Sequence, residues 1–174
     1  GSGGRTTTSL PALPDSVGRT VRPVDVDAVP DRYDTAATVE VVEPRVTTEH
    51  TARLRVTVRN TGEERRAYVF DPDPPMHHEP SATGPGTLVL LAADGRHERA
   101  GADCWRPSGG VVGDGGETVT LAPGEAVQNT LGVWDAGTGA CLPPGAYAFR
   151  RQYPQFDDRH VENTWSFTLH LARP

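Results

Sequence analysis

Apolar and polar residues alternate in short segments of the chain, and this alternation predicts β-strands. Residues 53–59 place three apolar side chains on one side of an extended backbone, namely Leu54, Val56 and Val58, and arginine and threonine on the other. The same period at residues 164–171 gathers Trp165, Phe167, Leu169 and Leu171 on one face. Shorter runs predict strands at 39–42, 67–70, 88–91, 119–121, 127–134 and 147–149. About eight strands with frequent turn signals are typical of a two-sheet sandwich. We therefore predict an all-β, immunoglobulin-like antiparallel fold with negligible helix.

The N-terminal segment lacks the strand pattern of the rest of the chain. We interpret residues 1–4, a Gly-Ser-Gly-Gly sequence, as the remnant of an expression tag. Residues 5–34 lack sustained periodicity and contain several prolines, so we interpret them as an N-terminal tail or linker that ends in a lead-in strand. We expect the part up to about residue 20 to be poorly ordered or loosely docked. Residues 35–174 are predicted to form the sandwich domain.

Composition narrows the classes of partner. The chain has 17 basic and 23 acidic residues and a net charge of -6, which argues against nucleic-acid binding and against electrostatic attachment to anionic lipid. No apolar run reaches about 18 residues, so no transmembrane segment is predicted. A tail rich in Thr, Ser and Pro often tethers an exported domain. We expect an extracytoplasmic protein, either secreted or anchored at the cell surface through a lipid upstream of this sequence.

The two cysteines, Cys104 and Cys141, agree with an exported protein. Neither cysteine has a second Cys or a His two to four residues away, so their spacing fits no zinc motif. An even number of cysteines in an exported chain predicts a disulfide bond. The alternative is two separately buried thiols that act as small apolar residues.

An ordered series of short motifs resembles a known family. Residues 54–62 read L-R-V-T-V-R-N-T-G, residues 121–125 read L-A-P-G-E, residues 133–135 read V-W-D, and residues 142–147 read L-P-P-G-A-Y. In this order, across residues 50–153, the motifs resemble the BsuPI-type intracellular proteinase inhibitor family. The resemblance implies a β-sandwich and makes protease inhibition an alternative function.

The same resemblance assigns no inhibitory residue in this chain. The motifs make turns and corners, and Tyr147 is placed to close a tyrosine corner. The chain also departs from the family in its cysteine pair, its proline-rich loop and its apparently exported tail, whereas the family name implies the cytosol.

Two long loops interrupt the predicted strands, at residues 71–86 and 101–116. Loops of this length in a compact domain are often functional. The first loop is rich in proline, and a loop inserted into a protease cleft would need proline to hold it rigid. The candidate binding residues in the two loops are Pro74, Pro75, His77, His78, Trp105 and Arg106.

One local cluster, Met76, His77, His78 and Glu79, has side chains that suit a metal ion. Imidazole and thioether groups suit copper, and imidazole with carboxylate suits zinc. Adjacent side chains of an extended loop point apart, so we interpret the cluster as a solvent-exposed polar loop and predict no cofactor. A copper or zinc carrier is kept as an alternative. Calcium binding by Asp71, Asp73, Asp157 and Asp158 is a further alternative.

Catalysis has little support in the sequence. There is no G-x-S-x-G motif, and the glycine-rich residues 109–116 lack the lysine of a P-loop. The remaining histidines (His50, His97, His160 and His170) are scattered and are interpreted as surface residues. We assign Trp134 and Trp165 to the core, whereas Trp105 either packs on a disulfide or forms an exposed binding platform. The leading hypothesis is a non-enzymatic binding or assembly module with an unknown protein or surface partner.

Overall fold

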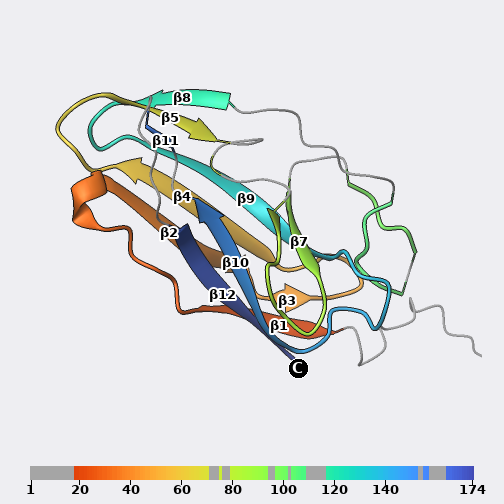
Figure 1. Cartoon of the computed structure of the whole chain (residues 1–174). Helices are drawn as coiled ribbons and strands as arrows, with labels where there is room; N and C mark the ends of the chain where they lie inside the picture. Colours follow the sequence, from red (N-terminus) through yellow and green to blue (C-terminus); the bar gives the residue numbers. More distant parts are fainter. Residues whose placement is uncertain are drawn as a thin grey trace, which may run out of the picture.

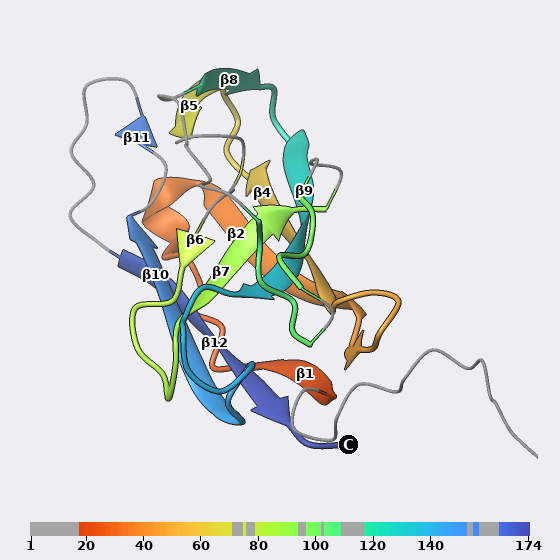
Figure 2. The same ribbon diagram turned by 90° about the vertical axis from the view of Figure 1, so that its right-hand side faces the viewer.

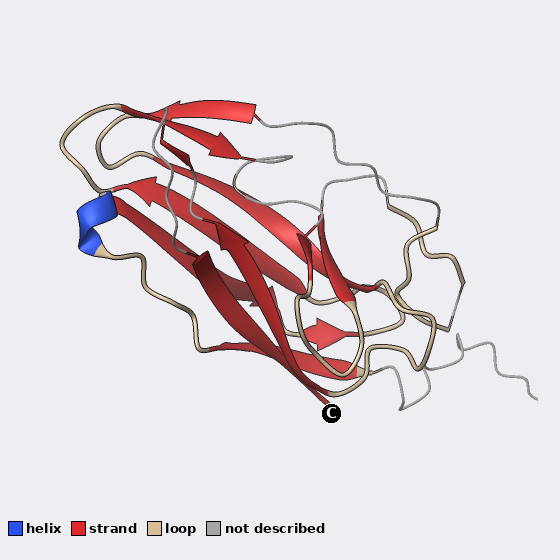
Figure 3. Cartoon of the chain, viewed as in Figure 1, coloured by secondary structure: helices blue, strands red, loops and turns tan. Residues whose placement is uncertain are grey.

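The computed structural model describes residues 18–70, 75, 79–93, 97–101, 103–108, 117–152, 155–156 and 164–174. Every strand pairing in these residues is antiparallel. The helical content of the described chain is one short 3-10 turn, η1 (Asp31–Tyr33), drawn in blue in Figure 3. The prediction of an all-β antiparallel protein with negligible helix is confirmed for these residues.

One sheet has four strands in the order β10 (Gly145–Gln152), β12 (Thr164–Ala172), β1 (Arg19–Val24) and β3 (Arg45–Val46). The lead-in segment supplies β1, in which Val21 lies opposite Leu171 of β12. Strand β1 therefore lies inside the sheet, between β12 and β3 (Figure 1).

A second sheet has five strands in the order β2 (Thr35–Glu43), β4 (Arg53–Asn60), β9 (Ala126–Asp135), β7 (Leu88–Ala92) and β6 (Glu79–Pro80). The alternation that predicted β4 is observed, since its even-numbered residues are buried and its odd-numbered residues are more exposed. The outward side chains of β4 lie beside those of β9, with Arg53 opposite Gly132 and Arg55 opposite Thr130.

A small three-stranded sheet lies at the end of the molecule away from the C-terminus, in the order β11 (Gln155–Phe156), β5 (Arg66–Phe70) and β8 (Glu117–Leu121) (Figures 1 and 2). Strand β5 follows the turn after β4 but pairs with β8 and not with β4. Both edges of β4 are already occupied by β2 and β9. The side-chain nitrogen of Asn60 donates to the carbonyl oxygens of Glu64 and Leu121, which holds the turn against β8.

The hydrophobic core is continuous between the two larger sheets. It joins Leu54, Val56 and Val58 of β4 to the inward residues of β10 and β12, which are Tyr147, Phe149, Trp165, Phe167, Leu169 and Leu171. The rings of Phe149 and Phe167 stack with their centroids 5.2 Å apart. Two antiparallel sheets on either side of one core are consistent with a β-sandwich.

Tyr147 makes the hydrogen bond expected of a tyrosine corner, because its hydroxyl donates to the carbonyl oxygen of Pro143. Gly84 packs directly against the Tyr147 ring. A Cβ atom at Gly84 would lie 2.3 Å from the ring, and the residue has a φ of +155°. Only glycine fits this close approach between the 81–86 loop and β10.

No helix in the described part of the chain is long and apolar enough to span a membrane.

Candidate functional site

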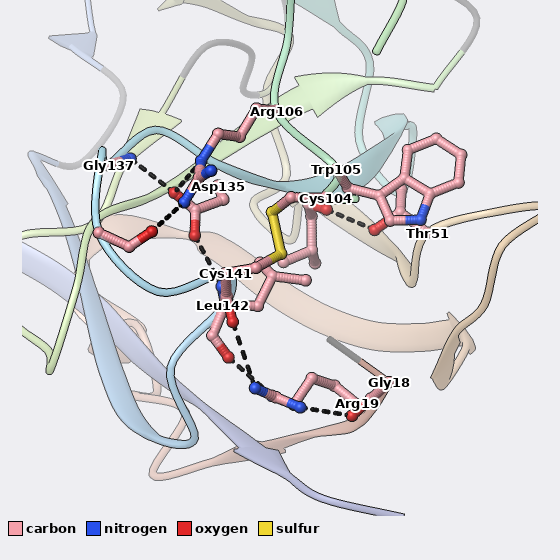
Figure 4. The surroundings of a disulfide bond; sticks show 12 residues. Gly18, Arg19, Thr51, Cys104, Trp105, Arg106, Asp135, Gly137, Cys141 and Leu142 are labelled. Atoms are coloured by element: carbon pink, nitrogen blue, oxygen red, sulfur yellow. Dashed lines mark hydrogen bonds and ion pairs between the residues drawn. A yellow bond between two sulfur atoms is a disulfide. The ribbon is translucent and has the colours of Figure 1, made fainter. Parts of the chain in front are cut away.

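Cys104 and Cys141 form a disulfide bond, as predicted, with their Cα atoms 5.7 Å apart. The bond closes a sequence separation of 37 residues. In the chain-entropy model a loop of this length contributes about 4 kcal/mol to stability. The disulfide joins the segment made of residues 97–101 and 103–108, which we call the cover segment, to the turn that follows β9 (Figure 4).

The carboxylate of Asp135, which is 2% exposed, organises the turn that carries Cys141. It accepts hydrogen bonds from the backbone nitrogens of Leu142 (2.6 Å) and Gly137 (2.7 Å) and forms an ion pair with Arg106 at 3.5 Å. The ligand atoms of Cys104, Asp135 and Cys141 lie within 4.8 Å of one another. Both sulfurs are bonded to each other and the carboxylate oxygens accept hydrogen bonds, so this group is structural in the oxidised protein.

On the other side of the same turn lies Arg19, the first residue of β1, which is 2% exposed. Its guanidinium donates to the carbonyl oxygens of Leu142 (2.7 Å) and Cys141 (3.2 Å). Burial lowers the pKa of Arg19, and the charge of Arg173 lowers it further. Arg19 could not be recognised from the sequence pattern, because it lies in the segment interpreted as tail and lead-in.

Two rings of the cover segment, those of His97 and Trp105, lie against the outer face of β7 and β9. Val89, Leu91 and Trp134 point outward from these strands, yet they are buried, and Trp105 packs against them. Strand β7 is therefore apolar on both faces, which explains its continuous Leu-Val-Leu-Leu run.

Trp105 is fixed on this outer face. Its indole nitrogen donates a 2.7 Å hydrogen bond to the carbonyl oxygen of Thr47, and its ring meets Trp134 edge-on at 5.3 Å. The guanidinium of Arg99 lies 4.6 Å from the Trp105 ring centroid. In Figure 4 the indole points away from the disulfide, so it does not stack on the sulfurs. Trp105 packs against both the main core and the outer cluster of Val89, Leu91 and Trp134.

A small hollow, which we call the tryptophan cleft, opens beside these two indoles. Its volume is about 150 Å³, and its lining includes His50, Arg53, His97, Trp105, Gly132 and Trp134. Gly132 lies in the interior of β9, where a Cβ atom would lie 3.1 Å from the indole nitrogen of Trp134. The missing side chain leaves this part of the sheet surface open as the floor of the cleft.

The indole nitrogen of Trp134 has no hydrogen-bond acceptor among the described residues, although the residue is only 7% exposed. The one fully buried side-chain nitrogen or oxygen without a partner, over the same residues, is Nδ1 of His170. The Trp134 nitrogen lies 3.1 Å from where a Cβ of Gly132 would be, and both residues line the cleft, so we place this N–H at the cleft floor.

His50 has a defined hydrogen-bond orientation at the cleft. Its Nδ1 lies 3.2 Å from the carbonyl oxygen of Thr51, which can only accept. In the neutral ring Nδ1 therefore carries the proton, and Nε2 is an acceptor. His50 and His97 are scattered in the sequence, where their pattern predicts surface residues, and the structure brings both to this one cleft.

A second, more open hollow adjoins the first, and we call it the sheet groove. Its volume is about 540 Å³; it shares Arg53 and Ala93 with the cleft and extends along Arg55, Gln128 and Thr130. Arg55 pairs with Glu40 at 3.2 Å. Arg53 is exposed, and no described carboxylate pairs with it.

Of the residues singled out from the sequence, Trp105 and Arg106 lie beside the disulfide, as Figure 4 shows. Pro75 is buried, and Glu79 opens the short strand β6 opposite Leu90. Pro74, Met76, His77 and His78 lie outside the described residues, as do the four aspartates considered for calcium. Metal binding at these positions stays a prediction.

Comparisons of the chain with models of protein families, with curated proteins and with solved structures found no match.

Proposed function

We propose that this chain is a non-enzymatic, immunoglobulin-like binding module that works outside the cytoplasm, and that the tryptophan cleft is its ligand-facing surface. The observation that carries this proposal is the Trp134 indole N–H, which faces the cleft without an acceptor in the described chain. Buried donors in native proteins are nearly always satisfied, and an unsatisfied one costs about 1–3 kcal/mol. A donor at an open cleft can be satisfied by water, which a ligand oxygen can replace.

The composition of the cleft supports a binding role. Ligand sites combine ring surfaces with a few polar groups in fixed positions. Trp105, Trp134 and His97 provide the rings here, with His97 and Trp134 meeting edge-on at 6.4 Å. The polar groups come from other elements, since His50 precedes β4 and Arg53 opens it.

The support around the cleft favours a rigid site. The disulfide holds the cover segment at Cys104, and the backbone nitrogen of Asp135 donates to the carbonyl oxygen of Trp105 at 2.7 Å. The bond from Trp105 to Thr47 fixes the opposite wall. A binding site on rigid elements loses less conformational entropy when a ligand binds.

The disulfide also supports the extracytoplasmic location, because such bonds persist in oxidising compartments. The tyrosine corner at Tyr147 and the two packed sheets support the immunoglobulin-like assignment. Alkylation of the protein in its source cells under denaturing conditions tests the location. Two thiols that react before reduction would contradict it.

The binding role is tested on arrays that carry oligosaccharides and peptides, probed with the wild-type chain and with Gly132→Ala. The added methyl group would occupy the floor of the cleft beside Trp134. Gly139→Ala is the matched control, since a Cβ there meets no atom within 4 Å. We expect binding that Gly132→Ala weakens and Gly139→Ala preserves. No binding to either array, or binding that Gly132→Ala leaves intact, would contradict the proposed function.

A further inference from the structure

The mixture of hydrogen-bonding groups around the tryptophan cleft discriminates between classes of ligand. Trp134 and Arg53 offer donors, whereas the Nε2 of neutral His50 and the carboxylate of Glu49, which also lines the cleft, offer acceptors. A metal ion requires acceptors, and a phosphate group is bound by donors. A hydroxyl group both donates and accepts, so a ligand rich in hydroxyls can use both kinds of group.

The ring surfaces of the cleft fit the same ligand. The π-faces of indoles carry partial negative charge and attract polarised C–H groups. A sugar ring presents C–H groups on its faces and hydroxyls on its rim. Trp134 is only 7% exposed and the Arg99 guanidinium covers one face of Trp105, so the part of the Trp105 ring that lines this hollow of about 150 Å³ is the surface offered to one such ring.

The sheet groove continues the cleft in a way that suits a chain of sugars. The two hollows share Arg53 and Ala93, and the groove adds Arg55, Gln128 and Thr130, whose polar side chains point outward from β4 and β9. Arg53 has no described carboxylate partner and lies where the two hollows join. Its guanidinium can therefore donate to oxygens of two successive rings.

An extended peptide fits the groove less well. Peptides that bind sheets usually add a strand to a free edge, where unpaired main-chain groups give affinity. The groove instead lies over β4 and β9, and each of these strands is paired on both sides within the five-stranded sheet. Only side chains are available to a ligand there, and hydroxyls can be satisfied by side chains alone.

We infer that the ligand is a glycan chain, with one sugar ring in the tryptophan cleft beside Trp134 and the adjoining rings along the sheet groove past Arg53. This inference rests on the proposed function, because it names the class of ligand that the same cleft binds. Trp105 supplies ring surface, Trp134 and Arg53 donate to ligand oxygens, and His50 and Glu49 accept from hydroxyls.

The test uses soluble cello-, chito- and galacturono-oligosaccharides, titrated into the whole chain and followed by calorimetry. We expect at least one of them to bind. Arg53→Ala should weaken that binding about tenfold or more, because it removes donors at the junction of the hollows. Arg22→Ala is the matched control, since Arg22 is an exposed arginine on β1 of the opposite sheet. The Arg22→Ala variant should bind the same oligosaccharide with the affinity of the wild type.

Trp105→Ala removes a wall of the cleft, but it also removes the Thr47 hydrogen bond and can disturb folding. Arg53→Ala and Gly132→Ala keep the inference testable, because both leave this bond in place. If these two variants weaken binding to peptides and the wild type binds no oligosaccharide, the glycan inference is wrong and the binding role stands. Oligosaccharide binding that neither variant changes would overturn both proposals.

Discussion

The indole nitrogen of Trp105 donates a 2.7 Å hydrogen bond to the carbonyl oxygen of Thr47, across a sequence separation of 58 residues. Thr47 also begins a tight turn, in which its hydroxyl accepts from the backbone nitrogens of Glu49 and His50. The single bond from Trp105 to Thr47 therefore joins two walls of the tryptophan cleft, one from the cover segment and one from the turn before β4.

Replacing Trp105 with Phe tests this link. The variant keeps an aromatic ring but removes the donor, and the Thr47 carbonyl then relies on water. We expect the free energy of unfolding to fall by about 1 kcal/mol, the usual value of a net hydrogen bond, with a further loss from the smaller ring. Urea denaturation measures the change. A variant as stable as the wild type would show that the link does not stabilise the protein.

Reduction of the disulfide should lower stability strongly. The bond restricts the unfolded chain over a separation of 37 residues, and we expect a loss of about 4 kcal/mol. Urea denaturation with and without a reductant measures it. The denatured, unreduced protein should have no thiol that reacts with an alkylating reagent. Reactive thiols before reduction, or equal stability in both states, would contradict this account of Cys104 and Cys141.

Asp135→Asn should destabilise the turn around the disulfide. The carboxylate accepts from Leu142, Gly137 and Arg106, and an amide would direct an NH2 group at one of these donors. Loss of a buried, paired charge costs about 3 kcal/mol. Glu40→Gln is the control, because its ion pair with Arg55 is solvent-exposed and should contribute about 0.5 kcal/mol. Equal effects of the two substitutions in urea denaturation would contradict the structural role of Asp135.

Alkaline pH should destabilise the protein through its buried tyrosines. Burial raises the pKa of Tyr147 to about 12, helped by the nearby charge of Asp135 and opposed by that of Arg19. Burial also raises the pKa of Tyr68. The folded state therefore holds these protons more tightly than the unfolded state, whose tyrosines titrate near pH 10.

The sign of the effect follows from this difference. The stabilisation by protonated Tyr147 is complete below pH 10 and is lost as the pH rises through about 12. Urea denaturation between these limits should show falling stability, and Tyr147→Phe should reduce the slope without abolishing it, because Tyr68 remains. A tyrosinate absorbance titration in which every tyrosine ionises near pH 10 would contradict this prediction.

The strands with strict alternation were predictable from the sequence. Leu54, Val56 and Val58 of β4 are buried as their period requires, and so are the four inward residues of β12. The disulfide followed from the cysteine count and the expected export. The Tyr147 corner followed from the motif around it. The strands and the tyrosine corner depend on local sequence pattern, and the disulfide has only one possible pairing because the chain has two cysteines.

The cleft was not predictable in the same way, because it depends on packing between distant segments. The assignment of Trp134 to the core is confirmed. Its burial on the outer face of β9, however, depends on the cover segment, whose Trp105 packs against it. His50 and His97 become neighbours of one cavity only through the β4–β9–β7 ladder. Gly132 is the one residue whose position in the sequence points to the cleft. It interrupts an otherwise regular strand, and a glycine in a strand often marks a place where a ligand or another backbone approaches closely.

The most direct test of the central claim uses the three indole N–H groups, observed separately by NMR in the nitrogen-labelled protein. Trp105 and Trp165 donate to the carbonyl oxygens of Thr47 and Asp27, whereas Trp134 has no described acceptor and faces the cleft. In the free protein we expect the Trp134 proton to exchange with solvent fastest. When the binding oligosaccharide or peptide is added, the Trp134 signal should shift most and its exchange should slow. A Trp134 signal that is already protected in the free protein, or that stays unchanged while ligand binds, would contradict the claim that this cleft is the binding surface.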